Sequence, residues 1–140
     1  TYTVLATFNG TRIGGYSVSL RTSDPPQCAA GDLVLGATRE GEIAAGDCRV
    51  RDHAPGTTDT SLADAYRLSV AERGVVSIEM RSTAFAPGVV LLDAAGRRLA
   101  AGSGLDVVRI AGTIEPGTYI VLATAIGALT GPYTLRAILE

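Results

Sequence analysis

The stretch Gly117-Thr118-Tyr119-Ile120-Val121-Leu122-Ala123-Thr124, followed by Gly131-Pro132-Tyr133-Thr134-Leu135, decides how this chain is organised. The first residues, Thr1-Tyr2-Thr3-Val4-Leu5-Ala6-Thr7, repeat it without a gap at an offset of 117 positions. Over residues 1–19, nine aligned residues are identical. These blocks contain the β-branched and aromatic residues that favour strands. The chain therefore opens with a copy of its own ending, and we call residues 1–19 the N-terminal copy.

The middle of the chain alternates apolar and polar residues, as half-buried strands do. Within residues 65–70 and 75–80, every second residue is large and apolar, which places these side chains on one inward face. Residues 89–92 are all apolar, as expected for a strand covered on both faces. Gly and Pro interrupt the chain too often for long helices. The pattern predicts an all-β, antiparallel β-sandwich, and a β-barrel is the alternative class.

Each expected strand is a short run bounded by turn residues. The runs cover residues 2–8, 16–20, 32–36, 40–43, 65–70, 75–80, 89–93, 98–100, 107–110, 118–124 and 131–135. We expect hairpins at both ends of the chain, within 1–22 and 118–135, and a third across the turn 71–74. The polar residues 49–62 predict an exposed loop.

The repeat and the loop Ser23-Asp24-Pro25-Pro26 divide the chain into three parts. We expect residues 1–22 to be the closing hairpin of a preceding repeat, 23–27 a linker, and 28–140 a complete sandwich. A lone hairpin is marginally stable in water. We therefore expect residues 1–22 to cover a neighbouring chain or an exposed sheet edge, which would make oligomers possible.

The bulk composition excludes several classes of protein. The chain has 140 residues, a net charge of −2, and 12 basic residues that are all Arg and scattered. This balance offers nothing that would attract nucleic acid or an anionic membrane. No run approaches the roughly 18 apolar residues of a membrane helix. The chain lacks an initiator Met and a signal peptide, so we expect it to be a processed piece of a longer protein.

The two cysteines, Cys28 and Cys48, form no CxxC motif, and the single His cannot complete a zinc site with them. A disulfide is the favoured interpretation. It would close a loop of about 20 residues and stabilise the fold by roughly 3 kcal/mol. Disulfides belong to oxidising compartments, so the chain is expected to be secreted or on the cell surface. The alternative is two buried free thiols.

The polar side chains offer little for catalysis. His53, with Asp52, Asp59 and Ser61 nearby in sequence, could be imagined as a triad, but the chain has no Gly-x-Ser-x-Gly elbow. A surface histidine is the simpler interpretation. Glu40 and Glu42 fit a solvated strand face. We therefore predict no catalytic residues and no cofactor.

Five ordered blocks carry a resemblance to a known family. They are Gly41-x-Ile43 with Gly46-Asp47, Asp64 to Val70, Val76 to Phe85, Val90 to Ala100, and Pro116 to Tyr119 through Gly131 to Leu135. Together residues 28–139 resemble a bacterial pre-peptidase C-terminal domain. The resemblance implies a jelly-roll-like β-sandwich that is appended to secreted proteases and other exported proteins and is not catalytic. The cysteine pair suits a subset of such domains.

Some relatives bind calcium, but this sequence departs from their pattern. Ala86 stands where relatives often have Asp after the Phe, and residues 101–104 replace an acidic run. Calcium takes about six to eight oxygen ligands. The remaining weak calcium candidates are Asp47, Asp64 and Asp93.

Three functions compete. The resemblance favours a non-catalytic adhesion or accessory module of an exported protein, with an extracellular protein or polysaccharide as partner and an unknown binding site. The alternative is a structural spacer in a tandem array, whose partners are neighbouring repeats or parent-protein domains. A small hydrolase using Ser61, His53 and Asp59 is the third.

Overall fold

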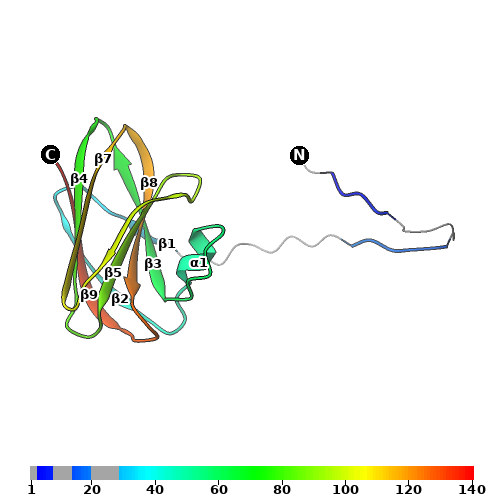
Figure 1. The fold of residues 1–140 in the computed structure, drawn as a ribbon, viewed down its shortest axis with the longest axis horizontal. Helices are drawn as coiled ribbons and strands as arrows, with labels where there is room; N and C mark the ends of the chain where they lie inside the picture. Colours follow the sequence, from blue (N-terminus) through cyan, green and yellow to red (C-terminus); the bar gives the residue numbers. More distant parts are fainter. Residues whose placement is uncertain (1–2, 8–13, 20–28) are drawn as a thin grey trace.

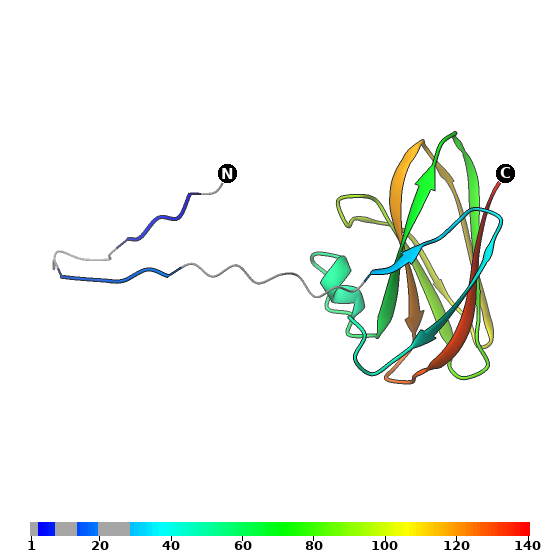
Figure 2. The same cartoon turned by 180° about the vertical axis from the view of Figure 1, so that it is seen from behind.

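The computed structural model describes residues 3–7, 14–19 and 29–140, and Figures 1 and 2 show it from two sides. The described residues form nine strands and one short helix. In chain order the elements are β1 (Ala29–Asp32), β2 (Thr38–Ile43), α1 (Val50–His53), β3 (Ala63–Val70), β4 (Gly74–Arg81), β5 (Pro87–Leu92), β6 (Arg98–Ser103), β7 (Val107–Ile114), β8 (Gly117–Ala125) and β9 (Gly131–Leu139).

The nine described strands form two sheets that face each other (Figure 1). One sheet has the order β1-β3-β8-β5-β6 and the other β2-β9-β4-β7. The predicted β-sandwich is confirmed, and the barrel alternative is excluded because the two sheets are separate. All pairs of strands are antiparallel except β1 with β3.

Most consecutive strands lie in different sheets, which corrects two of the predicted hairpins. β3 pairs with β8, whereas β4 pairs with β7 and β9, so residues 71–74 cross between the sheets. Likewise β8 lies between β3 and β5, while β9 lies between β2 and β4. Residues 117–139 are therefore an arch between the sheets rather than a hairpin, and we call them the closing arch. This alternation between sheets is typical of jelly rolls.

The core lies between the two sheets. The inward residues predicted for β3 and β4 are confirmed as buried: Tyr66, Leu68, Val70, Val76, Ile78 and Met80. Burial of such apolar side chains supplies the main driving force of folding. Residues 121–125 of β8 are all buried, because this strand is covered on both its inner and its outer face.

Part of the predicted exposed loop at 49–62 is buried, which corrects that expectation. Val50 of α1 and Ala54 pack on Leu122 of β8, on the outer face of the five-stranded sheet. The Val50 amide donates to the Ser61 carbonyl at 3.0 Å and holds this cover in place. A helix of four residues is too short to leave a helical period in the sequence.

The first strand of the sandwich is also displaced from its predicted place at 32–36. β1 ends at Asp32, and the following apolar residues turn toward the other sheet. Leu33 is buried and Val34 is exposed. Gly36 takes a φ of 81°, which favours glycine, and its amide donates to the Ala137 carbonyl. The apolar run therefore makes a turn whose first residue fills the core.

The described parts of the N-terminal copy, residues 3–7 and 14–19, are exposed and belong to no strand. Figure 1 shows both segments apart from the sandwich. The hairpin expected within 1–22 is thus not formed between these two segments. The turn at Asn9-Gly10, the linker 23–27 and Cys28 lie outside the described residues.

Candidate functional site

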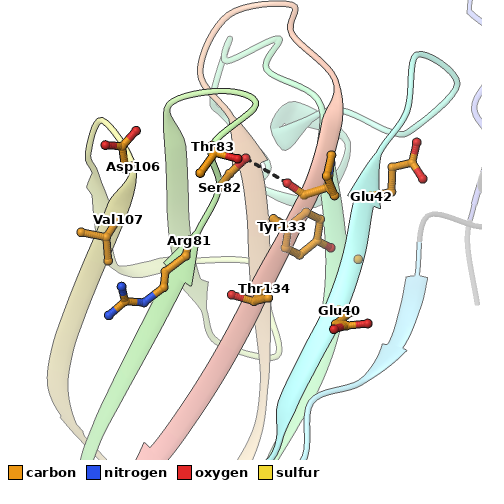
Figure 3. A pocket seen from close by; sticks show the side chains of 11 residues that line it. Glu40, Glu42, Arg81, Ser82, Thr83, Asp106, Val107, Tyr133 and Thr134 are labelled. Atoms are coloured by element: carbon orange, nitrogen blue, oxygen red, sulfur yellow. Dashed lines mark hydrogen bonds between the residues drawn. The ribbon is translucent and has the colours of Figure 1, made fainter.

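A groove of about 810 Å³ lies on the outer face of the four-stranded sheet. Glu40, Thr134, Arg81 and Val107 are successive Cα partners across β2, β9, β4 and β7, so one row of side chains crosses the whole sheet. Figure 3 shows Glu40 and Glu42 on one side of the groove and Asp106 on the other. The strand alternation places Glu40, Thr134, Arg81 and Val107 on one face, and Asp106 joins them from the connection before β7.

The groove is acidic. Glu40, Glu42 and Asp106 contribute three carboxylates to its lining, and Arg81 contributes one guanidinium. Arg81 donates to Glu79 at 2.6 Å, and Glu79 also pairs with Arg109. These hydrogen bonds lower the pKa of Glu79 and keep it ionised. The lining therefore favours a positively charged ligand.

Hydrogen bonds hold the end of the groove in shape. The Ser82 hydroxyl donates to the Pro132 carbonyl at 2.9 Å and accepts from the Ala84 amide at 3.1 Å. The Ser82 amide donates to the Asp106 carbonyl at 3.0 Å. Three segments are thereby linked through one buried serine, so bonds within the chain set the shape of the groove and binding needs little reorganisation.

A buried chain of hydroxyl groups lies beneath the groove. Tyr133 donates to the Asp64 carboxylate at 2.5 Å, and its oxygen lies 2.5 Å from the Tyr66 hydroxyl. Because Tyr133 has one hydroxyl proton, Tyr66 is the donor between the two rings. The chain joins β9 to β3 and so ties the two sheets together.

Burial sets the protonation of this chain. Desolvation raises the pKa of Asp64, and the neighbouring charge of Asp47 raises it further. Desolvation and the hydrogen bond to Asp64 raise the pKa of Tyr133 far above its ordinary value. The hydroxyl of Tyr133 is therefore fixed as a donor and is no candidate base or nucleophile.

The surroundings of Gly41 explain why β2 has a glycine between Glu40 and Glu42. A Cβ built there would collide with the hydroxyl end of Tyr133 and lie 2.7 Å from the Tyr66 hydroxyl. Next to it, the Arg39 guanidinium lies 5.8 Å from the centroid of the Tyr66 ring and donates to the Ala30 carbonyl. The β2 backbone thus closes directly over the two tyrosines.

The structure brings together two of the three calcium candidates. Asp47 and Asp64 are neighbours, but Asp64 accepts from Tyr133 and Asp47 accepts from the Ala44 amide at 2.6 Å. Asp93 lies in the β5–β6 turn and binds Arg97. Within residues 3–7, 14–19 and 29–140, no group of three or more His, Cys, Asp or Glu could hold a metal. Two engaged carboxylates fall short of the oxygen ligands that calcium takes.

The imagined triad is not assembled. Asp59 accepts from the Ser61 amide at 2.9 Å, which is a local turn contact. The Nε2 atom of His53 is buried without a hydrogen-bond partner, and burial lowers the pKa of His53. His53 is therefore not the exposed surface histidine that the sequence indicated.

The described part of the chain holds no free cysteine. Cys48 lies just before α1, where its carbonyl accepts from the Ala63 amide. Cys28 lies outside the described residues, so the Cys28–Cys48 disulfide stays a prediction.

Sequence reasoning missed most of the groove. Glu40 and Glu42 were correctly placed on an exposed strand face. Arg81, Thr83 and Asp106 come from other strands and loops. The only signal for Arg81 is its outward position in the alternation, which many surface residues share, and Thr83 and Asp106 lie in connections that have no period.

The comparison with solved structures decides the fold. The pre-peptidase C-terminal domain of collagenase from Bacillus anthracis matches with a TM-score of 0.59 and 18% identity, over 76% of this chain and 93% of that domain. This chain has the fold of a pre-peptidase C-terminal domain. The CBM35 of Abf62 from Cellvibrio japonicus matches with a TM-score of 0.39 and 10% identity, over 73% of this chain and 98% of that one.

Comparisons of sequence found no match. No protein-family model matches the chain, and no curated protein matches it. In the part of the chain that the structure describes, no helix has the length and apolar character needed to cross a membrane. The pre-peptidase C-terminal fold therefore rests on structural similarity.

Proposed function

We propose that this chain is a non-catalytic adhesion module of an exported bacterial protein. The groove would bind an extended, positively charged segment of an extracellular protein polymer. The observation that carries the proposal is the preformed acidic groove across the four-stranded sheet. The collagenase origin of the matched domain makes collagen the first polymer to test, and a secreted protease a candidate parent.

A role without catalysis fits the chemistry of the described polar groups. Ser61, His53 and Asp59 make no contacts with one another of the kind that activates a nucleophile. Asp64 and Tyr133 are neighbours, but both are locked in the hydroxyl chain. The groove offers charges that bind and none that is poised for proton transfer.

A protein ligand fits the groove better than a polysaccharide. Flat aromatic rings give a binding surface large contact area at low entropic cost. In the described sandwich, Tyr66, Tyr133 and Phe85 are buried and Tyr119 is half-buried, so no exposed ring lines the groove. The charged lining instead favours Lys and Arg side chains on an extended chain.

The test is co-sedimentation with insoluble collagen, chitin, cellulose and cell-wall glycan. We expect binding to collagen that weakens at high salt, because exposed charges are screened. The double variant Glu40→Gln and Glu42→Gln should lose most of this binding. Binding to none of the four polymers would contradict adhesion.

A matched control makes the same charge change at the other end of the sandwich. Glu72→Gln with Glu115→Gln removes two exposed carboxylates from the β3–β4 and β7–β8 connections. It should bind the polymer as the unaltered chain does. Equal losses from both double variants would mean that net charge alone, and not the groove, drives binding.

A spacer repeat is the second candidate function, and the N-terminal copy favours it. Duplication of the closing arch at an offset of 117 residues is expected of sandwich domains arranged in tandem. Small-angle scattering of a chain with two repeats would test it. A fixed distance between modules supports a spacer, and a broad distribution of distances contradicts it.

A further inference from the structure

We infer that the N-terminal copy is the closing arch of a second sandwich, and that its partner is a preceding repeat with strands equivalent to β1–β7. This inference rests on the tandem arrangement of the spacer function. The inference goes further by naming the strands that the copy packs against and the residues of the copy that recognise them.

The longest identical block of the copy corresponds to four buried residues of the closing arch. Val4, Leu5, Ala6 and Thr7 are identical to residues 121–124, which are at most 3% exposed. In the copy, Val4 and Leu5 are 61% and 81% exposed. A strand that is apolar on both faces needs a sheet on one side and a cover on the other. The copy therefore carries the burial pattern of β8 without the elements that bury it.

The copy also repeats the glycines that the arch requires. Gly10 and Gly14 correspond to Gly127 and Gly131, whose φ values are 88° and 144°. A Cβ on Gly131 would lie 2.5 Å from the Ala84 Cβ. Only glycine takes a positive φ, or tolerates so close a neighbour, at little cost in free energy. The close approach in the arch therefore explains Gly14, and the positive φ of Gly127 explains Gly10.

Tyr16 identifies the chemistry of the partner. Its equivalent, Tyr133, donates to Asp64 and accepts from Tyr66 in an Asp-x-Tyr strand. Tyr16 is 78% exposed and has the same hydroxyl to satisfy on burial. The partner strand should therefore present Asp and Tyr two residues apart.

The described sandwich of this chain has no free central position in its sheets for the two segments of the copy. Its own closing arch already occupies the positions between β3 and β5 and between β2 and β4. The arch also explains why residues 3–7 and 14–19 do not pair with each other. Their equivalents belong to different sheets, so each segment needs neighbours that only another sandwich provides.

The test keeps the full chain and adds residues 29–117 directly before Thr1. Gly117 then precedes Thr1 as it precedes Thr118, so the added strands are followed by the copy in the register of the closing arch. Amide hydrogen exchange by NMR is measured on this tandem chain and on the 140-residue chain. We expect exchange at residues 4–7 and 16–18 to slow by about 100-fold or more in the tandem chain.

Two neighbouring glycines provide a matched control. Gly14→Ala copies the collision at Gly131, whereas Gly15→Ala changes a position whose equivalent is the exposed Pro132. In the 140-residue chain neither added Cβ has an atom within 4 Å. In the tandem chain, Gly14→Ala should abolish the protection and Gly15→Ala should keep it.

Two results would overturn the inference. Unchanged exchange at residues 4–7 in the tandem chain would mean that the added strands do not bury the copy. Slow exchange in the 140-residue chain together with a dimer in sedimentation would make a second copy of this chain the partner. A protected copy in a tandem chain without fixed spacing would keep the inference and contradict only the spacer function.

Discussion

The closing arch and the N-terminal copy share nine of 19 residues and have opposite environments. In the arch, Val121 and Leu122 are fully buried, and in the copy Val4 and Leu5 are exposed. The arch forms two central strands, whereas the described parts of the copy, residues 3–7 and 14–19, belong to no strand. Strand formation here depends on neighbouring strands, because β propensity is mainly a property of packing context.

The largest expected difference between the two regions is at their shared leucine. Leu122→Ala should lower the free energy of unfolding by about 2–5 kcal/mol, because it leaves a cavity under α1. Leu5→Ala should change it by less than about 0.5 kcal/mol, since Leu5 is exposed. Urea unfolding of both variants measures the contrast. A similar loss from Leu5→Ala would show that the copy is packed in the single chain.

The shared glycine should give the next largest contrast. Gly131→Ala places a Cβ against Ala84 at a positive φ and should cost about 1–3 kcal/mol. Gly14→Ala meets nothing in the single chain and should leave the melting temperature unchanged. Thermal melts of the two variants decide it. A stable Gly131→Ala variant would contradict the close approach of the arch to the β4–β5 loop.

The shared tyrosine tests the hydroxyl chain. Tyr133→Phe removes the donor to Asp64 and the acceptor for Tyr66, and should cost about 1–2 kcal/mol. Tyr16→Phe removes an exposed hydroxyl and should cost nothing measurable. Chemical unfolding reports both values. Equal stability of the two variants would mean that the hydroxyl chain contributes no net free energy.

The smallest expected effect concerns the cover over β8, which the copy lacks. Burial lowers the pKa of His53 from 6.5, so the folded state favours the neutral ring. The contribution of His53 to the free energy of unfolding is present above pH 6.5 and is lost as the pH falls through the pKa of His53 in the folded state.

We therefore expect the unaltered chain to lose stability below pH 6.5 relative to His53→Leu. His53 is the one histidine of the chain, and comparison with this variant cancels the opposite contribution of Asp64, whose pKa is raised. Unfolding measured at several pH values tests it. Parallel stability curves for the two proteins would contradict a neutral His53 ring with a buried Nε2 atom.

Several parts of the fold were predictable from local pattern. The alternation in residues 65–70 and 75–80 placed the core side chains of β3 and β4 correctly, because a strand turns every second residue to the same face. The hairpins across 71–74 and 118–135 were wrong, since adjacency in sequence does not reveal which sheet a strand joins. The four-residue α1 left no period, so its cover over Leu122 was invisible.

The sequence by itself determined the all-β class, the inward faces of β3 and β4 and the duplication of the closing arch, whereas the two separate sheets that make it a sandwich and not a barrel come from the tertiary structure. These are properties of short segments, and the strand period and the glycine positions record them locally. Only the tertiary structure decided that the arch joins two sheets, that Tyr133 reaches Asp64, and that four strands assemble an acidic groove. Those features join residues far apart in the chain, and no local pattern encodes which distant residues become neighbours.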